Sequence, residues 1–453
     1  MKAKFFHLML VLAIATSMAG CSSGAAQTQS PASPPAANQP AASGELTLVS
    51  TFAFTDQWGR YYVVGEIQNN TNSAITSIGL TLELKDASGN SLLKDESGNS
   101  LASIPFSPLL YTLAPGQSAP FSYSYDASAG APATYNVTIA GHNPSQATLA
   151  DIKVEKAELI DNGNGSFHLS GELVNTGSQW VTINALAGAG LDSNDQVMTT
   201  DWSSTYTTEL APAGDAAGRD RTPFSIEFPV PGTAVVTHLG VYVDADLTDA
   251  PADYALAVEI TNNYFDNYNS FHLVGTLTNH SSEKLHTMIV GGLYAGDGST
   301  LDASWSFIPV IVEPGASIPF DMASFSSVNW NAKQASRVSS FTVRFDPWAT
   351  YAPSWEVVAL GSTGDQVSKD GATWTFSGSI LNNSGRGLSG ETIIIAVRDA
   401  QGKLIGTTYS YVSPDGDAIA GGQTTFYEVS LYLDPTADTT GYTFQTFVQG
   451  DVK

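Results

Sequence analysis

The side chains that could do chemistry are few in this chain, and the densest group of them is acidic. Asp244, Asp246, Asp249 and Asp253 fall within ten residues. Carboxylate oxygens are the ligands that Ca²⁺ prefers in proteins, so these four residues are a candidate calcium site. A solvated acidic linker is the commoner explanation of such a run. We therefore expect no cofactor, with calcium as the alternative.

Catalytic motifs are missing from the sequence. It contains no Gly-x-Ser-x-Gly, no His-Glu-x-x-His and no phosphate-binding loop that ends in Gly-Lys-Ser/Thr. Each of these patterns would place a nucleophile, a metal or a phosphate in a defined geometry. The single cysteine has no partner cysteine. The sequence therefore predicts a protein that is not an enzyme.

Tryptophans are a second candidate for function. Six of them could line a sugar-binding face: Trp180, Trp202, Trp305, Trp330, Trp348 and Trp355. Large aromatic side chains are more often part of a buried core. Both explanations stay open at the level of the sequence, and burial in the core is the commoner one.

One five-residue sequence motif, which we call the phrase, recurs four times and defines the units that must position these residues. Its copies are Gly65-Glu-Ile-Gln-Asn69, Gly171-Glu-Leu-Val-Asn175, Gly275-Thr-Leu-Thr-Asn279 and Gly378-Ser-Ile-Leu-Asn382. Successive glycines are 106, 104 and 103 residues apart. A period of this size is the length of a domain. The sequence therefore predicts four related domains.

Each phrase lies in a stretch where apolar and polar residues alternate, which is typical of a strand with one buried face. An aromatic residue stands four positions before each glycine: Tyr61, Phe167, Phe271 and Trp374. We expect this ring to lie over the core and the glycine to make room for it. We expect the asparagine to end the strand because Asn tolerates a left-handed backbone.

Two histidines share one position in the repeat. His168 and His272 each precede the phrase glycine by three residues and fall on the face opposite the aromatic residue. Tyr62 and Thr375 hold this position in the other copies, which disfavours a shared metal site. We expect both histidines to be exposed polar residues of a strand.

Segments with residues typical of turns follow each phrase at a constant spacing. Four of them begin 21 residues after the glycines: Asp86-Ala-Ser-Gly89, Asp192-Ser-Asn-Asp195, Gly296-Asp-Gly-Ser299 and Asp399-Ala-Gln-Gly402. Further on, three copies place a phenylalanine five residues after a later glycine: Phe121, Phe320 and Phe426. About seven short strands fit in each repeat. This pattern predicts an all-β chain of tandem immunoglobulin-like β-sandwiches.

The first copy contains a local duplication. Lys85-Asp-Ala-Ser-Gly-Asn-Ser-Leu92 is almost repeated as Lys94-Asp-Glu-Ser-Gly-Asn-Ser-Leu101. Removing nine residues restores the spacing of the other copies. We interpret this as a duplication that lengthens one hairpin.

The N-terminus predicts export and lipidation. Lys2 and Lys4 precede a short apolar run, and small residues follow as Met18-Ala-Gly-Cys21. This order is that of a signal peptide. The last four residues resemble the lipobox of bacterial lipoproteins, with Met18 where the family prefers Leu. The resemblance implies that the Cys21 thiol is lipidated and anchors the chain in a membrane. An ordinary secretory signal is the alternative.

Composition agrees with an extracytoplasmic protein. Residues 22–44 contain only small and polar residues and four prolines, so we expect a disordered tether. The whole chain has 18 basic and 43 acidic residues and a net charge of −25. Such a charge disfavours nucleic acid as a partner.

The strand phrase and its turn resemble a known family. Gly-x-hydrophobic-x-Asn is followed by Leu82-Glu-Leu-Lys-Asp86 in the first copy and by Ile395-Ala-Val-Arg-Asp399 in the fourth. These segments resemble the FxLYD domain of bacterial surface lipoproteins, although Lys85 and Arg398 stand where the family has Tyr. The resemblance implies an extracellular β-sandwich and supplies no catalytic residues.

The expected organisation follows from these boundaries. Residues 1–20 are the signal peptide, 21–44 the lipidated cysteine and tether, and the four sandwiches span 45–145, 150–249, 253–348 and 353–453. We expect a lipid-anchored protein of the bacterial cell envelope that acts as a multi-domain spacer, scaffold or display module. The alternative is an adhesin-like module that binds a glycan, a peptide or another envelope protein, stiffened by calcium at the junction of the second and third sandwiches.

Overall fold

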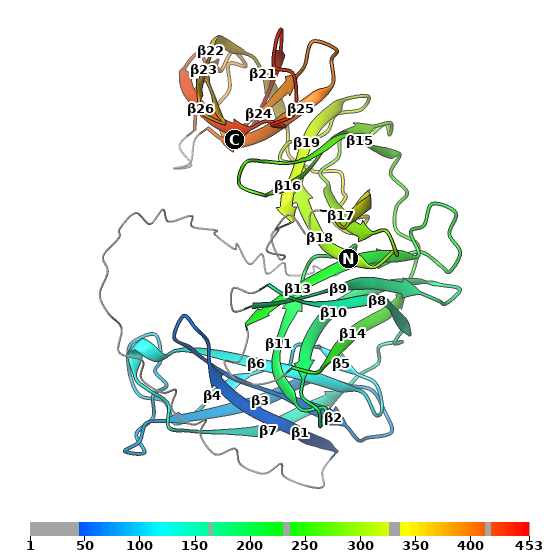
Figure 1. Cartoon of the computed structure of the whole chain (residues 1–453), viewed down its shortest axis with the longest axis vertical. Helices are drawn as coiled ribbons and strands as arrows, with labels where there is room; N and C mark the ends of the chain where they lie inside the picture. Colours follow the sequence, from blue (N-terminus) through cyan, green and yellow to red (C-terminus); the bar gives the residue numbers. More distant parts are fainter. Residues whose placement is uncertain (1–44, 163–165, 230–235, 326–335, 413–417, 453) are drawn as a thin grey trace. The chain divides into compact units, whose positions relative to one another are not determined.

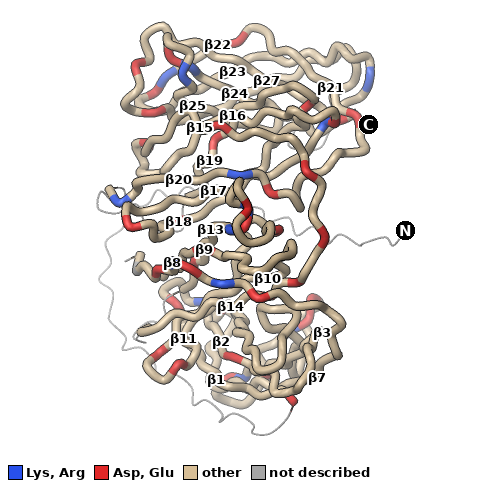
Figure 2. The backbone as a smooth tube through the Cα atoms, turned by 90° about the vertical axis from the view of Figure 1, so that its right-hand side faces the viewer, with Lys and Arg blue, Asp and Glu red and all other residues tan. Residues whose placement is uncertain are grey.

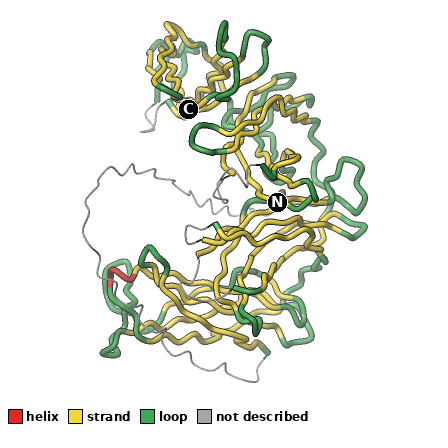
Figure 3. The backbone as a smooth tube through the Cα atoms, in the orientation of Figure 1, coloured by secondary structure: helices red, strands yellow, loops and turns green. Residues whose placement is uncertain are grey.

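The computed structural model describes residues 45–452 with gaps at 163–165, 230–235, 326–335 and 413–417. The described residues form 27 strands and one 3-10 turn, η1 (Ala127–Ala129). Figure 3 shows strand throughout, with η1 as the helical segment. The prediction of an all-β chain is confirmed. None of the described helices is long and apolar enough to cross a membrane.

The strands form eight antiparallel sheets, which we describe as four sheet pairs. In each pair, a phrase sheet contains the repeated phrase and a second sheet faces it across a core. The phrase sheets have the orders β1-β2-β6, β13-β9-β8, β15-β16-β19 and β22-β23-β26. The second sheets are centred on β3, β10, β17 and β24.

Sheet pair 1 consists of β1 (Leu46–Thr55), β2 (Arg60–Asn69), β3 (Ile75–Lys85), β4 (Ile104–Phe106), β5 (Thr112–Leu113), β6 (Ser118–Asp126) and β7 (Thr134–Pro144). Sheet pair 2 consists of β8 (Ile152–Asp161), β9 (Ser166–Asn175), β10 (Trp180–Leu191), β11 (Val197–Ser203), β12 (Glu209–Leu210), β13 (Arg221–Pro229) and β14 (His238–Thr248). Figure 1 labels most of these strands.

Sheet pair 3 consists of β15 (Leu256–Phe265), β16 (Phe271–Asn279), β17 (Met288–Ala295), β18 (Thr300–Phe307), β19 (Ser317–Phe325) and β20 (Val338–Phe345). Sheet pair 4 consists of β21 (Val357–Leu360), β22 (Ser362–Asp370), β23 (Thr373–Leu381), β24 (Leu388–Arg398), β25 (Leu404–Tyr411), β26 (Thr424–Tyr432) and β27 (Thr443–Val452).

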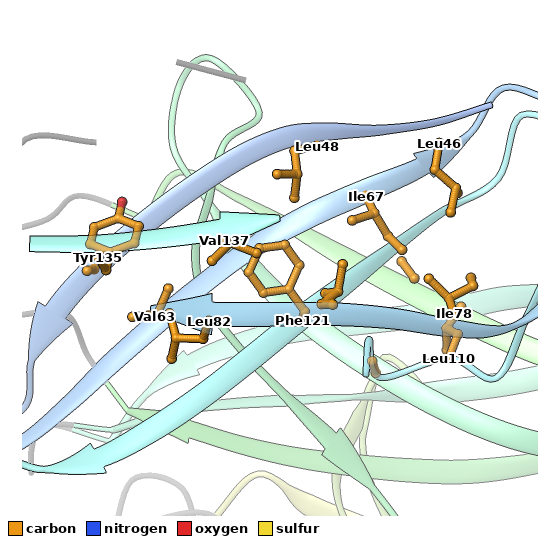
Figure 4. Packing of buried hydrophobic residues seen from close by; sticks show 14 of the residues in the cluster. Leu46, Leu48, Val63, Ile67, Ile78, Leu82, Leu110, Phe121, Tyr135 and Val137 are labelled. Carbon is orange, nitrogen blue, oxygen red and sulfur yellow. The ribbon is translucent and has the colours of Figure 1, made fainter. Parts of the chain in front are cut away.

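The core of a sheet pair is formed by the inward side chains of both sheets. In pair 1, Leu48, Val63, Leu82, Phe121 and Val137 are buried in one cluster. Figure 4 shows these side chains pointing into the space between the sheets. Alternation along each strand places them on one face, and their burial is the main favourable term that holds the two sheets together.

The phrase glycine makes room for a ring on the neighbouring strand. Phe121 pairs across from Gly65, and a Cβ on that glycine would lie 2.5 Å from the ring. The carbonyl of Ser50, at a bulge in β1, closes the other side. The expectation that the glycine serves the aromatic residue four positions earlier was therefore wrong.

The same arrangement recurs in the other copies. The rings opposite the remaining phrase glycines are Phe224, Phe320 and Tyr427. In pair 4 the ring is thus Tyr427 and not Phe426, which points outward and is 77% exposed. In pair 4 the spacing in the sequence therefore placed the ring one residue too early. A shift of one residue moves a side chain to the other face of the strand.

The phrase asparagines are buried hydrogen-bonding groups. The side-chain amide of Asn69 donates to the carbonyl of Ser73 at 2.9 Å and to that of Leu113 at 3.0 Å, while its Oδ1 accepts from the Thr71 amide. The corresponding contacts recur at Asn175, Asn279 and Asn382. None of the four has a positive φ. These side chains therefore join the strand end to the opposite sheet, and the expected left-handed backbone was wrong.

The predicted turns are present. Gly89, Gly298 and Gly402 have φ values near +82°, and Asp195 has a φ of 59°. The duplicated segment of pair 1 forms the same turn twice, since Gly98 donates to Asp95 as Gly89 does to Asp86. Leu92 and Leu101 of this segment pack against the core of pair 1.

Candidate functional site: contacts between sheet pairs and an aromatic surface

Three predicted elements lie outside the described residues. They are the signal peptide, the tether and the lipidation site Cys21. Trp330 of the tryptophan set also lies outside. For these parts of the chain the sequence-based predictions stand as predictions.

The outer face of a phrase sheet packs against the second sheet of the next pair. The residue just before the phrase glycine shows this best. Val64 of pair 1 is buried with Ala189 and Val197 of pair 2. Val274 of pair 3 is buried with Ala396 and Leu404 of pair 4.

Between pairs 2 and 3 the same contact is polar. Ser170 holds the position of Val64 and Val274, and its hydroxyl donates to the Thr300 carbonyl at 2.6 Å. Arg344 of pair 3 donates to the carbonyls of Gly218 and Arg221 in pair 2. At this position of the repeat the middle contact is therefore a hydrogen bond, where its two neighbours have apolar side chains.

Asp244 is part of the contact between pairs 1 and 2. Its Oδ2 accepts from the backbone amides of Thr112 at 2.8 Å and Tyr111 at 3.2 Å. Burial raises the pKa of Asp244, although these hydrogen bonds oppose the rise. The carboxyl group satisfies two amides of the preceding pair. We use the name clasp for this kind of contact, in which a side chain on or directly after the last strand of one pair binds a loop or short strand of the pair before.

The clasp recurs at both later contacts. Asp346 of pair 3 accepts from the amide and hydroxyl of Thr208 at 3.3 and 3.0 Å. Gln449 of pair 4 exchanges two hydrogen bonds with the backbone of Ile311, at 2.7 and 3.0 Å.

The other aspartates of the candidate calcium site are spread out. Asp246 lies two residues along β14 from Asp244, Asp249 is exposed, and Asp253 lies 3.8 Å from the guanidinium of Arg219. Among the described residues, no three acidic, histidine or cysteine side chains gather in a way that could hold a metal ion. In the structure, Asp244 binds backbone amides and Asp253 faces a cation.

His168 is fully buried in the contact between pairs 2 and 3, so its predicted exposure was wrong. Its Nε2 lies 3.1 Å from the Leu301 carbonyl and 3.7 Å from Asp302 Oδ1, and Ser225 Oγ lies 3.5 Å from Nδ1. Burial lowers the pKa of His168 to about 3, and the Leu301 carbonyl offsets this only in part. The imidazole is therefore neutral.

This group contains a serine, a histidine and an aspartate, but their setting does not suit catalysis. His168 and Asp302 have no exposed surface and Ser225 is almost fully buried. A substrate would have no access to the serine hydroxyl while the two sheet pairs are in contact. The group fits a structural role in the contact.

His272 is also buried, at the contact between pairs 3 and 4, so the same prediction was wrong here. Its Nδ1 lies 2.7 Å from Asp321 Oδ2, its Nε2 lies 3.5 Å from Asp266, and Tyr264 stacks on its ring at 4.6 Å. Burial by itself would lower the pKa of His272. The carboxylates of Asp321 and Asp266 outweigh this effect and raise that pKa.

The tryptophans are mostly at the surface, so their expected burial in sandwich cores was wrong. Trp202, Trp348 and Trp355 are exposed, and Trp180 and Trp305 are half-buried. Trp374 is the one buried tryptophan among the described residues. It is the aromatic residue of the fourth phrase strand.

Five rings form a continuous aromatic surface on sheet pair 3 and the segment after it: Trp305, Phe307, His286, Tyr351 and Trp355. Successive ring centroids are 5.0, 6.1, 5.2 and 6.3 Å apart. Phe307 is 46% exposed, Tyr351 41% and Trp355 38%. The sequence placed Trp305 and Trp355 in one candidate set but could not show their neighbours.

The chain carries more acidic than basic residues. Acidic positions outnumber basic ones (Figure 2), in agreement with the net charge of −25. Most basic side chains near the contacts are paired with acids, as in Arg337 with Glu158 at 2.6 Å and Arg219 with Asp215 at 2.9 Å.

Comparisons with known proteins identify no relative of this chain. No protein-family model and no curated protein matches it. Among solved structures, red sea bream transglutaminase matches 43% of this chain and 29% of its own, at 14% identity and a TM-score of 0.14.

The α2-macroglobulin of E. coli matches 88% of this chain and 28% of its own, at 8% identity and a TM-score of 0.13. PorU of Porphyromonas gingivalis matches 90% and 33%, at 11% identity and a TM-score of 0.12. The chain thus spans about a third or less of each of these proteins. Scores this low carry no argument about function.

Proposed function

We propose that this chain is a non-catalytic, lipid-anchored protein of the bacterial cell envelope that acts as a multi-domain spacer or scaffold outside the cytoplasm. The observation that carries the proposal is the clasp, which occurs at three successive contacts with Asp244, Asp346 and Gln449. A protein that must hold its units in a fixed relation needs such contacts. A string of independent binding domains does not.

Each sheet pair is proposed to be one immunoglobulin-like sandwich, which makes four domains in tandem. The support is the matching order of strands around each phrase and the core cluster between the sheets of each pair, two of which extend to residues of a neighbouring pair. Such domains bury enough apolar surface to fold as units. The packed contacts between them would restrict their relative motion.

Small-angle X-ray scattering on residues 45–453 tests the spacer role. We expect one maximum dimension that does not change with salt or calcium, because the contacts are made by buried side chains. A distribution of sizes typical of a flexible chain would contradict the proposal. Shortening on addition of a chelator would support instead the alternative in which calcium at Asp244, Asp246, Asp249 and Asp253 stiffens the junction.

The membrane anchor is a separate part of the proposal and rests on the lipobox resemblance at Cys21. Labelling cells with a radioactive or clickable fatty acid should mark the wild-type chain and leave Cys21→Ala unmarked. The variant should also appear in the soluble fraction. Retention of Cys21→Ala in the membrane, with no loss of label, would contradict lipidation at this residue.

A binding role is the second candidate, and the aromatic surface favours it. Exposed apolar patches on a soluble surface commonly mark interaction sites. The ligand could be a glycan, a peptide or an envelope protein. A choice between these classes needs the chemistry of the surface itself.

A further inference from the structure

The aromatic surface is held in place before any ligand arrives. His286 and Tyr351 exchange two backbone hydrogen bonds, at 2.9 and 3.0 Å. The Trp355 carbonyl accepts from the Lys284 ammonium group, and the Trp355 side chain donates to Asp451. Rings that are already ordered lose little conformational entropy on binding, which favours affinity.

The polar groups around these rings carry little free charge. Arg386 forms two hydrogen bonds with Glu356, at 2.7 and 2.8 Å, and Lys284 is engaged by the Trp355 carbonyl. Burial lowers the pKa of His286, which keeps its ring neutral near pH 7. Among these groups the charge of Arg386 is paired with a carboxylate and Lys284 donates to a neutral carbonyl, while the net charge of −25 would repel an anionic polymer.

The same kind of side chain recurs at the same place in the repeat. Trp202, Trp305 and Tyr409 lie on β11, β18 and β25, opposite residues that follow their phrase glycines by 16, 15 and 16 positions. Trp202 and Tyr409 are exposed. In pair 1 the position is held by Pro105. Three successive units that each present an aromatic ring suit a ligand with chemically similar units along its length.

We propose that the aromatic surface binds an uncharged polysaccharide. The C–H face of a pyranose ring is apolar and packs on the negative face of an aromatic ring, while its hydroxyl edge stays in water. The ligand that fits exposed neutral rings, paired charges and repetition is a neutral sugar polymer. This inference goes beyond the spacer role and does not depend on it.

The first test is a glycan array probed with the full-length chain in detergent, which contains neutral and anionic oligosaccharides. Binding to at least one neutral oligosaccharide of four or more units is expected. No binding to any neutral glycan, or binding to anionic glycans alone, would overturn the proposal. Binding to proline-rich peptides in place of glycans would also overturn it, because aromatic surfaces can bind such peptides.

Variants then locate the site. Phe307→Ala and Trp355→Ala should each weaken binding of the neutral oligosaccharide at least tenfold by calorimetry. Trp58→Ala is the matched control, because Trp58 is 66% exposed in a turn of pair 1 and belongs to no part of the aromatic surface. It should bind as the wild type does. Equal affinity in all four proteins would place the sugar elsewhere and overturn the proposal.

Ligand length tests the role of repetition. Trp202→Ala and Tyr409→Ala should leave the affinity for a tetrasaccharide unchanged and lower the affinity for the long polymer about threefold or more. Melting curves of each variant report whether the fold is kept. Since the altered side chains are exposed, we expect the melting temperature to stay within about 2 °C of the wild type.

Discussion

His168 and His272 hold the same position in two copies of one repeat, yet the structure gives them opposite properties. Both are buried where one sheet pair meets the next. His168 faces a carbonyl and a serine hydroxyl and stays neutral, with its pKa lowered to about 3. His272 lies between two carboxylates, and its pKa is raised. The neighbours of a side chain, and not its place in the repeat, decide its charge.

The difference extends to the contacts themselves. The contact around His168 also includes Ser170, Arg344 and the ion pair of Arg337 with Glu158. The contact around His272 also includes the buried Val274 and Ala396. One geometry of packing is thus met by two chemistries. The polar groups of either contact need hydrogen-bond partners, whereas the apolar side chains contribute through the area that they bury.

The largest expected effect comes from removing the carboxylate beside His272. Asp321→Ala removes the carboxylate that does most to raise the pKa of His272 and leaves a buried imidazole with Asp266 at 3.5 Å. Loss of one partner of a buried charged pair costs about 3–5 kcal/mol. Hydrogen exchange at the amides of β16 and β25 should therefore become much faster at pH 6.

A double variant provides the control for that experiment. His272→Gln in the Asp321→Ala background removes the charge and should restore much of the protection. If Asp321→Ala exchanges as slowly as the wild type, the pair does not stabilise this contact. The proposed opposition between the two histidines would then fail.

The second prediction uses pH to separate the contacts. The pKa of His168 is lowered on folding, so its contribution is full above about pH 6.5 and is lost as the pH falls towards 3. A difference of one pH unit corresponds to about 1.36 kcal/mol, so the loss of stability at pH 5 is about 2 kcal/mol. Protection factors of the amides of β9 and β18, which correct for the intrinsic pH dependence of exchange, should fall between pH 6.5 and 5, and His168→Gln should flatten this dependence.

His272 should behave in the opposite way. Its pKa is raised on folding, so its contribution is full below about pH 6.5 and is lost as the pH rises through the folded value. Amides of β16 and β25 should thus be better protected at pH 6 than at pH 8. If amide protection changed with pH in the same direction at both contacts, the pKa values of the two histidines would not be shifted in opposite directions.

The third prediction concerns the clasp. Asp346→Ala removes an acceptor from the amide and hydroxyl of Thr208, and Gln449→Ala removes two hydrogen bonds to Ile311. A hydrogen bond to a charged group is worth about 1.5–3 kcal/mol and a neutral one about 1. Local protection should fall at each altered contact and stay constant at the other two, with Asp249→Ala as an exposed control.

The smallest expected effect is that of the ion pair at the middle contact. Arg337 and Glu158 are partly exposed and lie 2.6 Å apart. Such pairs contribute about 0–1 kcal/mol and are screened by salt. Glu158→Gln should therefore change exchange at β9 and β18 by less than threefold, and 1 M salt should remove the difference. A loss as large as that of Asp346→Ala would assign the contact's strength to its charges.

The sequence predicts what depends on one sheet pair and fails where two pairs meet. Alternation in Phe167–Leu173 predicts a strand and Asp86–Gly89 predicts a turn, and the structure confirms both elements, although β9 is buried on both faces. The exposure of His168 depends on a sheet about 130 residues further along the chain. A local pattern contains no record of such a neighbour. The expectation of a solvated outer face was therefore reasonable for one sandwich and wrong for this chain.

The sequence nevertheless contained one indication of the contacts between sheet pairs. The residue before the phrase glycine is Val64, Ser170 and Val274 in the first three copies, and none is charged. A strand face in water usually carries charged residues. The tryptophans were misjudged for a related reason, because size and apolarity favour burial in a core but do not distinguish a core from an exposed surface.

The clasp gives the chain a direction. Each pair presents its phrase sheet to the pair that follows and its last strand to the pair that precedes, so every junction joins the same two kinds of surface. Removing the residues between equivalent positions that follow Thr112 and Thr208 would bring Asp346 opposite Thr112 in place of Thr208. The junction would again be one carboxylate against backbone amides. Recombination between copies can thus change the number of domains in a gene and keep the clasp, while the second sheet of pair 3, which binds pair 2 through polar groups, would then face Val64 of pair 1.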